Sequence, residues 1–394
     1  MKNRYFFIIL LFFYNICFSQ EINKKYVENY YTKTVEYNKN QVDGKIVIEF
    51  ENTIYALNDF LMGNPINAKY FGVKADGVSD DTKFLQLAIN YCTQNGLTLF
   101  LPTGRIITTS EIDIKLNKNA STKFRLVGNG ISNSVIINKG ENTKIAINVM
   151  GNYYDMFSMK DFSIERVDNG KPTGGVGIKL NKLVYADFEN IDVFRFNIGL
   201  ILNDISSSSF RKVNARWGTI GAILTLEPNG MSNPNLIDFN SCIFNSNQEW
   251  GIKINNAHNV NFNSCLFEDN TKGGINLSYN NSNSAVSVNV RDSYFEGNSG
   301  YDIYLKSYGQ GSHNFYGNTF NRVSNKKFTE NNIYIEIDSS IPNVFENSIN
   351  MEGNGFFSAN TYQPSDKRKN VKIVSNNRKT NITDNNSYRN PIEK

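Results

Sequence analysis

The sequence is poor in cysteine, proline, histidine and tryptophan. Among 394 residues there are four Cys, eight Pro, two His and two Trp. Cys17 lies within the first nineteen residues, and the other three Cys are an odd number, which argues against a framework of paired disulfides. The two His, His258 and His313, follow no metal-ligand spacing, so the sequence predicts no metal site.

Long hydrophobic runs are absent after the first twenty residues. Lys2 and Arg4 precede an apolar stretch that ends at Phe13, and a cleavage site with small residues precedes Gln20. This arrangement predicts a secretory signal peptide over residues 1–19. The alternative is a membrane anchor, but the stretch is too short to cross a bilayer. We therefore expect a secreted, periplasmic or cell-surface protein with no membrane insertion after signal removal.

An excess of basic charge is missing from the body of the chain, although the net charge is +4. Residues 361–394 carry eight Lys or Arg against three Asp or Glu, and the leader adds Lys2 and Arg4. The remaining body is slightly acidic. A nucleic-acid-binding protein concentrates basic charge on its folded surface, so no nucleic-acid partner is expected.

What the sequence does contain is a repeat, which is clearest over residues 235–277. Phe239-Asn-Ser-Cys-Ile-Phe244 returns 23 residues later as Phe262-Asn-Ser-Cys-Leu-Phe267, and each copy leads into a Gly-Ile-x-Ile/Leu strand. A fixed period in the twenties is typical of a solenoid. Alternating apolar residues indicate short strands, and one such coil needs copies above and below it to bury its inner face.

The Gly-Ile-x-Leu strand sets the phase of the coils over residues 150–350. Copies begin at residues 177, 199, 221, 251 and 274, and weaker ones stand at 302–305 and 332–335. This predicts a single-stranded right-handed parallel β-helix of roughly seven to nine coils. Cys242 and Cys265 share one slot with parallel Cβ vectors, so no disulfide is expected between them.

One further column is predicted to stack its amides: Asn190, Asn240, Asn263 and Asn318.

An amphipathic helix is predicted over residues 81–95, where apolar residues recur on one face and Gly96 ends the pattern. Asp76 and Asp80 precede it, and Asp81 is its first residue. They fit a metal cluster or helix capping, and we favour capping by Ser79 or Asp80 because side-chain oxygens there satisfy free backbone amides.

The segment from Phe71 to Gly104 resembles the N-terminal signature of the pectate lyase superfamily domain. The signature reads FG-x-x-x-DG-x-x-DDT, then a helix, a strand and LP-x-G. The resemblance implies a pectin-lyase-like β-helix whose open end is capped by the helix, as in rhamnogalacturonases and tailspike depolymerases. Its members include lyases and hydrolases, so it implies no single reaction. The expected division is signal peptide (1–19), unassigned segment (20–66), β-helix (67–360) and basic polar tail (361–394).

Reactive residue types collect at the turn before the Gly-Ile-x-Leu strand and on that strand's outer side. Glu268 and Glu296 each follow the core Phe of their coil, so they are expected to stack about 5 Å apart. Such a pair suits glycosidase acid/base chemistry, and the alternative is a pair of solvated turn residues. The predicted catalytic set is Glu268, Glu296, Asp269, Glu249 and Lys253. The predicted substrate-binding set is Trp217, Trp250, Arg195 and Tyr304.

Two functions remain open from the sequence. The first is a secreted enzyme that cleaves a polysaccharide bound along the β-helix, as a glycoside hydrolase or a polysaccharide lyase. A lyase would use Lys253 or Arg195 as base, with calcium held by Asp269 and Glu268. The second is a non-catalytic glycan-binding or surface β-helix. The sequence does not decide between a monomer and a homotrimer.

Overall fold

The computed structural model forms two compact units, Met1–Pro65 and Ile66–Lys394. It describes residues 31–33, 47–50, 53–57, 65–116, 124–140, 144–153, 156–166, 174–226, 230, 234–255, 257–278, 286–307, 311–322, 330–337, 347–358, 370–375 and 380–388. The predicted signal peptide over residues 1–19 lies outside these ranges.

The first unit contains a three-stranded antiparallel sheet in the order β1-β3-β2. Its strands are β1 (Tyr31–Lys33), β2 (Val47–Phe50) and β3 (Thr53–Leu57). The sequence assigned no structure to this segment, because its apolar runs are short and follow no repeat.

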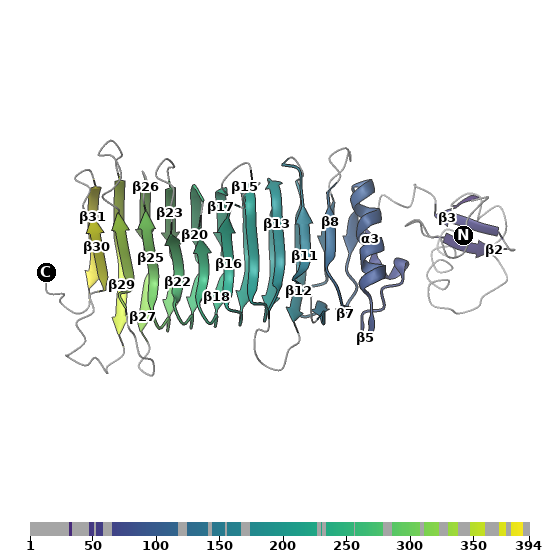
Figure 1. Cartoon of the computed structure of the whole chain (residues 1–394), viewed down its shortest axis with the longest axis horizontal. Helices are drawn as coiled ribbons and strands as arrows, with labels where there is room; N and C mark the ends of the chain where they lie inside the picture. The colour runs from purple at the N-terminus through teal and green to yellow at the C-terminus, as the bar shows by residue number, and fades with distance from the viewer. Residues whose placement is uncertain are drawn as a thin grey trace, which may run out of the picture. The chain divides into compact units, whose positions relative to one another are not determined.

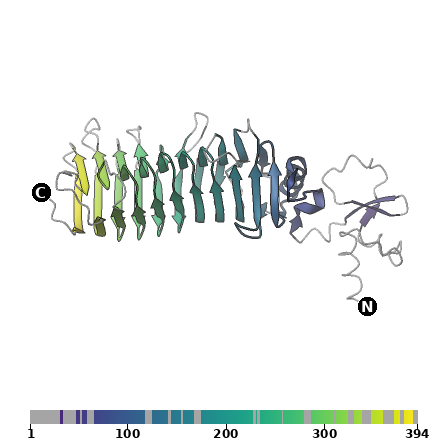
Figure 2. The same cartoon turned by 90° about the horizontal axis from the view of Figure 1, so that it is seen from below.

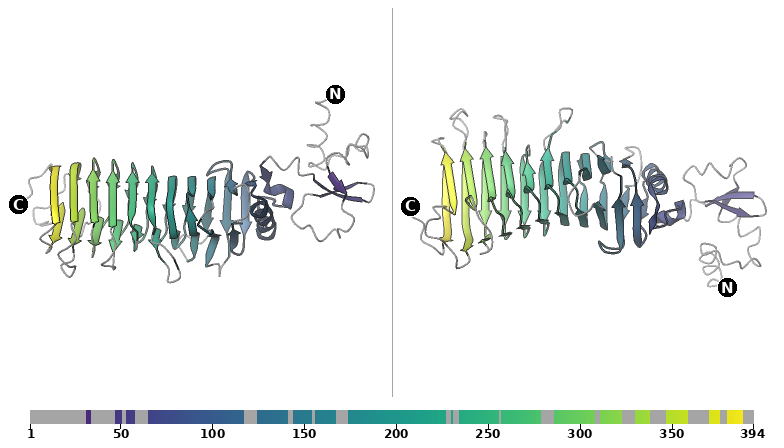
Figure 3. Two further views of the ribbon diagram at one scale, coloured as in Figure 1. Left: turned by 90° about the horizontal axis from the view of Figure 1, so that it is seen from above. Right: turned by 60° about the horizontal axis from the view of Figure 1, so that its bottom comes forward.

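The second unit is a right-handed parallel β-helix with three faces, as the repeat predicts. Each coil supplies one strand to face A, then face B, then face C, and equivalent strands of successive coils pair in parallel register. Figure 1 shows these strands following one another from the helix α3 to β31, and Figure 2 and Figure 3 show the same succession from other sides.

Face A begins with the paired strands β4 and β6, and several of its later strands bend around a corner to continue on face B. Its strands are β4 (Ile66–Asn67), β6 (Thr98–Phe100), β9 (Arg125–Val127), the first parts of β12 (Ser158–Arg166) and β14 (Asp187–Phe194), the middle of β15 (Ile198–Arg216), β17 (Asn235–Asn240), β20 (Asn259–Asn263), β23 (Val286–Arg291), β26 (Gly311–Tyr316), the first part of β29 (Asn347–Ser358) and β31 (Thr380–Tyr388).

Face B takes up the chain after a short corner in each coil. Its strands are β5 (Asp76–Asp80), β7 (Gly104–Thr108), β10 (Ser134–Asn138), the last parts of β12, β14 and β15, β18 (Ile243–Asn245), β21 (Leu266–Glu268), β24 (Tyr294–Glu296), β27 (Thr319–Arg322) and the last part of β29.

Face C carries the strand that set the phase of the repeat. Its strands are β8 (Ile112–Lys115), β11 (Ile145–Met150), β13 (Val176–Val184), the first part of β15, β16 (Ile220–Thr225), β19 (Trp250–Ile254), β22 (Gly273–Ser278), β25 (Tyr301–Ser307), β28 (Ile333–Ile337) and β30 (Val371–Ser375). These ten strands exceed the predicted seven to nine coils, because β8 and β11 lack the Gly-Ile-x-Leu pattern and β30 lies within the segment assigned to the tail.

The core is filled by phenylalanine rings that stack from coil to coil. Phe210, Phe239 and Phe262 follow one another with ring centroids 5.0 and 5.1 Å apart. A second column contains Phe267 and Phe295, whose centroids are 4.9 Å apart. Stacked aromatic pairs add about 0.5–1.5 kcal/mol each beyond the apolar area they bury. The repeated Phe positions therefore hold successive coils in register.

The helix α3 (Thr82–Asn95) closes the N-terminal end of the β-helix, one residue shorter than the predicted range 81–95. Gln86 Nε2 donates to the carbonyl of Asp113 at 2.7 Å, and Gln86 Oε1 accepts from its amide at 2.9 Å. The Gln86 side chain thus makes the two backbone hydrogen bonds that a preceding strand would make to Asp113 of β8. This contact is how the helix protects the first strand edge of face C.

The three aspartates before α3 are engaged by protein donors. Asp80 Oδ1 accepts from the amide of Thr82, the first helical residue, at 3.0 Å, as predicted for a side-chain oxygen at the helix start. The N-cap residue itself is Asp81, and it makes no side-chain capping bond. Ser79 does not cap: its amide donates to Asp76, whose pKa falls to about 2 chiefly because of that hydrogen bond. Asp81 is buried and accepts from the amide of Lys74 at 2.7 Å.

Candidate functional site

The turn between faces B and C, called here the BC corner, repeats one backbone geometry in five successive coils. In each coil one residue takes a left-handed conformation, with φ between 56° and 66°. In four of these coils the amide of this residue donates to the carbonyl of the last face-B residue in the following coil, and in the fifth it donates to that of Asn321, one residue before the end of β27. These stacked residues are Arg195, Trp217, Ser246, Asp269 and Gly297. Three of the predicted site residues, Arg195, Trp217 and Asp269, thus share one turn position.

A ladder of buried asparagines supports the BC corner from inside. Asn247 Nδ2 donates to Asn270 Oδ1 at 2.9 Å, and Asn270 Nδ2 donates to Asn298 Oδ1 at 3.0 Å. Asn270 Nδ2 also donates to the carbonyl of Phe244 at 2.9 Å. Because each amide bridges two coils and the inner backbone, the ladder fixes the outward residues of the corner on a rigid support.

Glu268 and Glu296 are register partners at the ends of β21 and β24. Their neighbours Phe267 and Phe295 are fully buried, so strand alternation turns both carboxylates outward. Paired parallel strands lie about 4.8 Å apart, so the predicted stacking of the two acids is confirmed. Glu296 Oε1 accepts from Asn321 Nδ2 at 3.1 Å. Asp269 follows Glu268 directly and is exposed.

Glu249 lies in a different slot and is held by two lysines. Lys272 Nζ is 2.8 Å from its Oε1, and Lys253 Nζ is 3.1 Å from its Oε2. These bonds, that of Lys272 first, lower the pKa of Glu249 below its ordinary value. A carboxylate kept ionised in this way is a poor proton donor. The geometry therefore favours an ion-pair role for Glu249 and Lys253.

The two predicted tryptophans differ in exposure. Trp217 is 50 % exposed at the BC corner, whereas Trp250 is only 7 % exposed. Trp250 lies over Gly273, where a Cβ would come within 2.5 Å of the indole ring. Trp250 therefore packs at a coil corner, while Trp217 presents a ring to solvent.

Tyr304 belongs to a stack on the outer side of face C. Its ring is parallel to that of Tyr334, with centroids 5.3 Å apart and an interplanar angle of 3°. Lys372 Nζ lies 5.5 Å from the centroid of Tyr334. Because Tyr334 covers one face of the Tyr304 ring, the stack turns ring edges outward. Tyr304 can contact a ligand through its edge rather than as an open platform.

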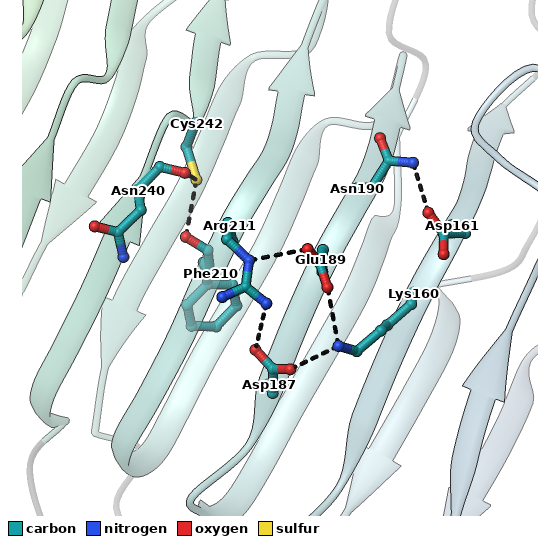
Figure 4. A network of polar contacts seen from close by, with 9 residues as sticks. All are labelled: Lys160, Asp161, Asp187, Glu189, Asn190, Phe210, Arg211, Asn240 and Cys242. Carbon is teal, nitrogen blue, oxygen red and sulfur yellow. Dashed lines mark hydrogen bonds and ion pairs between the residues drawn. The ribbon is translucent and has the colours of Figure 1, made fainter.

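Face A carries a charged network that the sequence did not reveal (Figure 4). Lys160 Nζ is 3.0 Å from Asp187 and 2.9 Å from Glu189, and Arg211 Nε is 3.0 Å from Glu189. The hydrogen bond from Arg211 is the main cause that lowers the pKa of Glu189 to about 2. Two cations and two carboxylates thus neutralise one another across three coils. Only the register could have shown this, since each cation is 22–29 positions from the carboxylates that it contacts.

The predicted column of asparagines mixes three different slots. Asn263 Nδ2 donates to Asn240 Oδ1 at 3.1 Å, so this part of the prediction is confirmed. Asn190 instead takes the left-handed turn position and donates to Asp161 (Figure 4), and Asn318 is buried and donates to Asn354. The prediction was wrong for Asn190 and Asn318. Outward, turn and inward positions follow one another within a few residues along each coil, and counting residues in the sequence did not distinguish them.

The three cysteines in the described ranges, Cys92, Cys242 and Cys265, are buried and free. Cys242 Sγ donates to the carbonyl of Phe210 at 3.3 Å, and Cys265 Sγ donates to that of Phe239 at 3.4 Å. Burial raises the pKa of the Cys242 thiol well above its ordinary value. Within the described ranges, no group of three or more His, Cys, Asp or Glu is arranged to hold a metal ion, and no helix has the length and hydrophobicity of a membrane span.

Comparison with known proteins gives matches for both sequence and structure. Residues 65–170 match the family model described as rhamnogalacturonase A/epimerase, pectate lyase-like. No curated protein sequence matches the chain. Among solved structures, the enzymatically active domain of tailspike protein 2 from bacteriophage CBA120 is 14% identical, with a TM-score of 0.54 over 87% of this chain and 56% of that chain.

A second solved structure gives a comparable match. ORF18 of Geobacillus virus E2 is 18% identical, with a TM-score of 0.50 over 80% of this chain and 68% of that chain. Identities this low concern the fold alone. Together with the three-faced parallel register, the family match establishes that the chain has the pectin-lyase-like parallel β-helix fold.

Proposed function

We propose that the chain is an exported enzyme that cleaves a polysaccharide bound along the BC corner. The observation that carries the proposal is the register of Glu268 and Glu296, which places two outward carboxylates on adjacent coils with Asp269 beside them. The match to a rhamnogalacturonase/epimerase model and the fold shared with a tailspike domain described as enzymatically active support it.

The proposed chemistry is glycoside hydrolysis. One carboxylic acid of the pair protonates the glycosidic oxygen while the other carboxylate attacks the anomeric carbon. Water then hydrolyses the glycosyl-enzyme bond, and the first residue takes its proton. The strand spacing of about 4.8 Å is close to the carboxyl separation of about 5–5.5 Å that favours a retaining mechanism.

Purified protein incubated with a panel of neutral and acidic polysaccharides tests the proposal. A hydrolase produces new reducing ends with no absorbance from unsaturated sugars, whereas a lyase produces both. Retention of anomeric configuration in the first product, observed by NMR, is expected from a pair on adjacent coils. If the panel includes a polysaccharide that the protein binds, and that substrate shows no cleavage, the hydrolase proposal is wrong.

A non-catalytic glycan-binding protein is the second candidate. The cluster of Phe194, Arg195 and Trp217 favours it, because these residues offer sugar contacts without an adjacent carboxylate pair. Binding without cleavage is the outcome that this candidate predicts.

We propose that residues 1–19 are a signal peptide that directs export and is then removed. The N-terminus of the mature protein recovered from the producing cells is then Gln20. Recovery of an intact N-terminus at Met1 would contradict the proposed export signal.

A further inference from the structure

The Phe194 ring at the BC corner lies against two guanidinium groups that have different partners. Arg195 Cζ is 4.7 Å from the ring centroid, and Arg216 Cζ is 5.1 Å from it. Arg216 makes a two-pronged bond to Asp192, with Nε 2.8 Å and Nη2 2.6 Å from the carboxylate oxygens. For Arg195, the described part of the chain supplies no hydrogen bond or ion pair to the guanidinium.

Arg195 differs in this respect from two other arginines on the outer side of the β-helix. Arg105 pairs with Glu165, and Arg211 pairs with Glu189. Arg195 is held in place differently: its backbone has φ 66°, and its amide donates to the carbonyl of Arg216 at 3.1 Å. The Phe194 ring then supports the cation through a cation–π contact. The result is a positioned cation whose hydrogen-bond donors are available.

Trp217 occupies the same turn slot one coil further on. Its ring centroid is 6.2 Å from that of Phe194, at an interplanar angle of 57°. The side chain is half exposed, and the described residues offer no partner to its indole N–H. A large exposed ring beside a free guanidinium combines an apolar surface for a sugar ring with donors for an anion.

We propose that Arg195 and Trp217 form a subsite for a sugar that bears an anionic group, either carboxylate or sulfate. The guanidinium fork binds two oxygens of the anion, and the indole packs against the sugar ring. This proposal rests on the proposed function, because it requires that a glycan binds along the BC corner. Asp269 stands three coils beyond Arg195 in the same slot, so the anionic sugar binds about 14 Å from the acid pair.

The test is a binding measurement in which cleavage plays no part. Affinity electrophoresis of the Glu268→Gln protein uses alginate as the carboxylate polymer, dextran sulfate as the sulfate polymer and dextran as the neutral one. Arg195→Ala and Trp217→Ala are each compared in this background. The matched control is Arg125→Ala, which removes the same charge from an exposed site on face A. Thermal unfolding confirms that each variant is folded.

We expect tighter binding to alginate or dextran sulfate than to dextran, and the anionic polymer that binds identifies the anion. Arg195→Ala and Trp217→Ala each weaken that binding about tenfold or more, while Arg125→Ala changes it less than twofold. Arg195→Lys restores part of the affinity, because it keeps the charge and loses the fork. Equal binding to dextran and both anionic polymers, or equal effects of Arg195→Ala and Arg125→Ala, overturns the subsite. Binding without cleavage in the wild type refutes only the hydrolase.

Discussion

Asn298 Nδ2 donates to Asp302 Oδ1 at 2.8 Å, and this contact ends the asparagine ladder of the BC corner on a buried carboxylate. Asn332 Nδ2 donates to the other oxygen at 2.6 Å. These two bonds and the charge of Arg322 favour the ionised form, but burial outweighs them and raises the pKa of Asp302 to about 6. The ladder therefore includes a group that titrates close to neutrality.

Asp302 is expected to make the protein more stable in mild acid than at neutral pH. Its pKa in the folded chain exceeds the ordinary value of 3.8, so its stabilising effect is complete below pH 4 and is lost as the pH rises through 6. Two pKa units correspond to about 3 kcal/mol. Asp302→Asn should remove this dependence, as urea unfolding at pH 4, 5, 6 and 7 will show. Asp292→Asn, at an exposed turn of the same region, is the control; an unchanged slope in Asp302→Asn contradicts the assignment.

His313 is expected to produce the opposite pH dependence. It is buried on β26 with no hydrogen-bond partner for either ring nitrogen, and burial lowers its pKa from 6.5 to about 4. Its stabilising contribution is present above pH 6.5 and is lost as the pH falls toward 4, by about 3 kcal/mol. His313→Leu should flatten the acid side of the stability profile and raise stability at pH 7, because two unpaired nitrogens are removed. A steeper acid loss in His313→Leu than in wild type would refute this.

Asn270 is expected to be the most costly member of the ladder to remove. Its side chain bonds Asn247 and Asn298 on both neighbouring coils and the carbonyl of Phe244. Asn270→Ala leaves several buried groups unpaired and should reduce the free energy of unfolding by about 2–5 kcal/mol. Asn276→Ala removes an outward amide of the next strand and should change it by less than 1 kcal/mol. Similar losses in both variants would show that the ladder is not special.

The fold could be predicted from sequence because inward positions repeat. Phe244 and Phe267 recur at one spacing and stack in the structure, and the Gly-Ile-x-Leu strand sets the register of face C. The same counting placed Glu268 over Glu296. The register of paired strands can thus be predicted from sequence where repeated buried residues determine it.

Side-chain partners at the surface could not be predicted in the same way. Arg195 and Arg216 are both arginines near one turn, yet only Arg216 has an acid, since Asp192 lies on the preceding coil and within reach of its guanidinium. Trp217 and Trp250 differ in burial because Trp250 packs against Gly273, which has no side chain to occupy the space that the indole ring fills. Such differences depend on which residues of the neighbouring coils lie beside each side chain. The sequence does not show this directly, because loops between the faces make the coils differ in length.

The thiols are expected to be reduced and unreactive in the folded protein. Cys242 and Cys265 are buried and donate to backbone carbonyls, and burial raises the pKa of Cys92 to about 12. Reagents that need a thiolate should label none of the three at pH 8 until the chain unfolds. Denatured, unreduced protein without residues 1–19 should then titrate with three thiols. A count of one would contradict this prediction, because two of the three thiols would then be joined in a disulfide.

Carboxylates at the BC corner are expected to divide into a reacting pair and an ion-pair anchor. If Glu268 and Glu296 act as acid and nucleophile, Glu268→Gln and Glu296→Gln should each reduce kcat about 10²–10⁴-fold on a substrate that the wild type cleaves. Glu249→Gln should reduce it far less, because Lys253 and Lys272 already hold that carboxylate ionised. Removing these half-exposed ion pairs should cost about 1 kcal/mol or less. Unfolding curves for all three variants separate lost chemistry from lost structure. Full activity in both Glu268→Gln and Glu296→Gln would place the reaction elsewhere, and a large loss in Glu249→Gln alone would move it to the lysine-bound carboxylate.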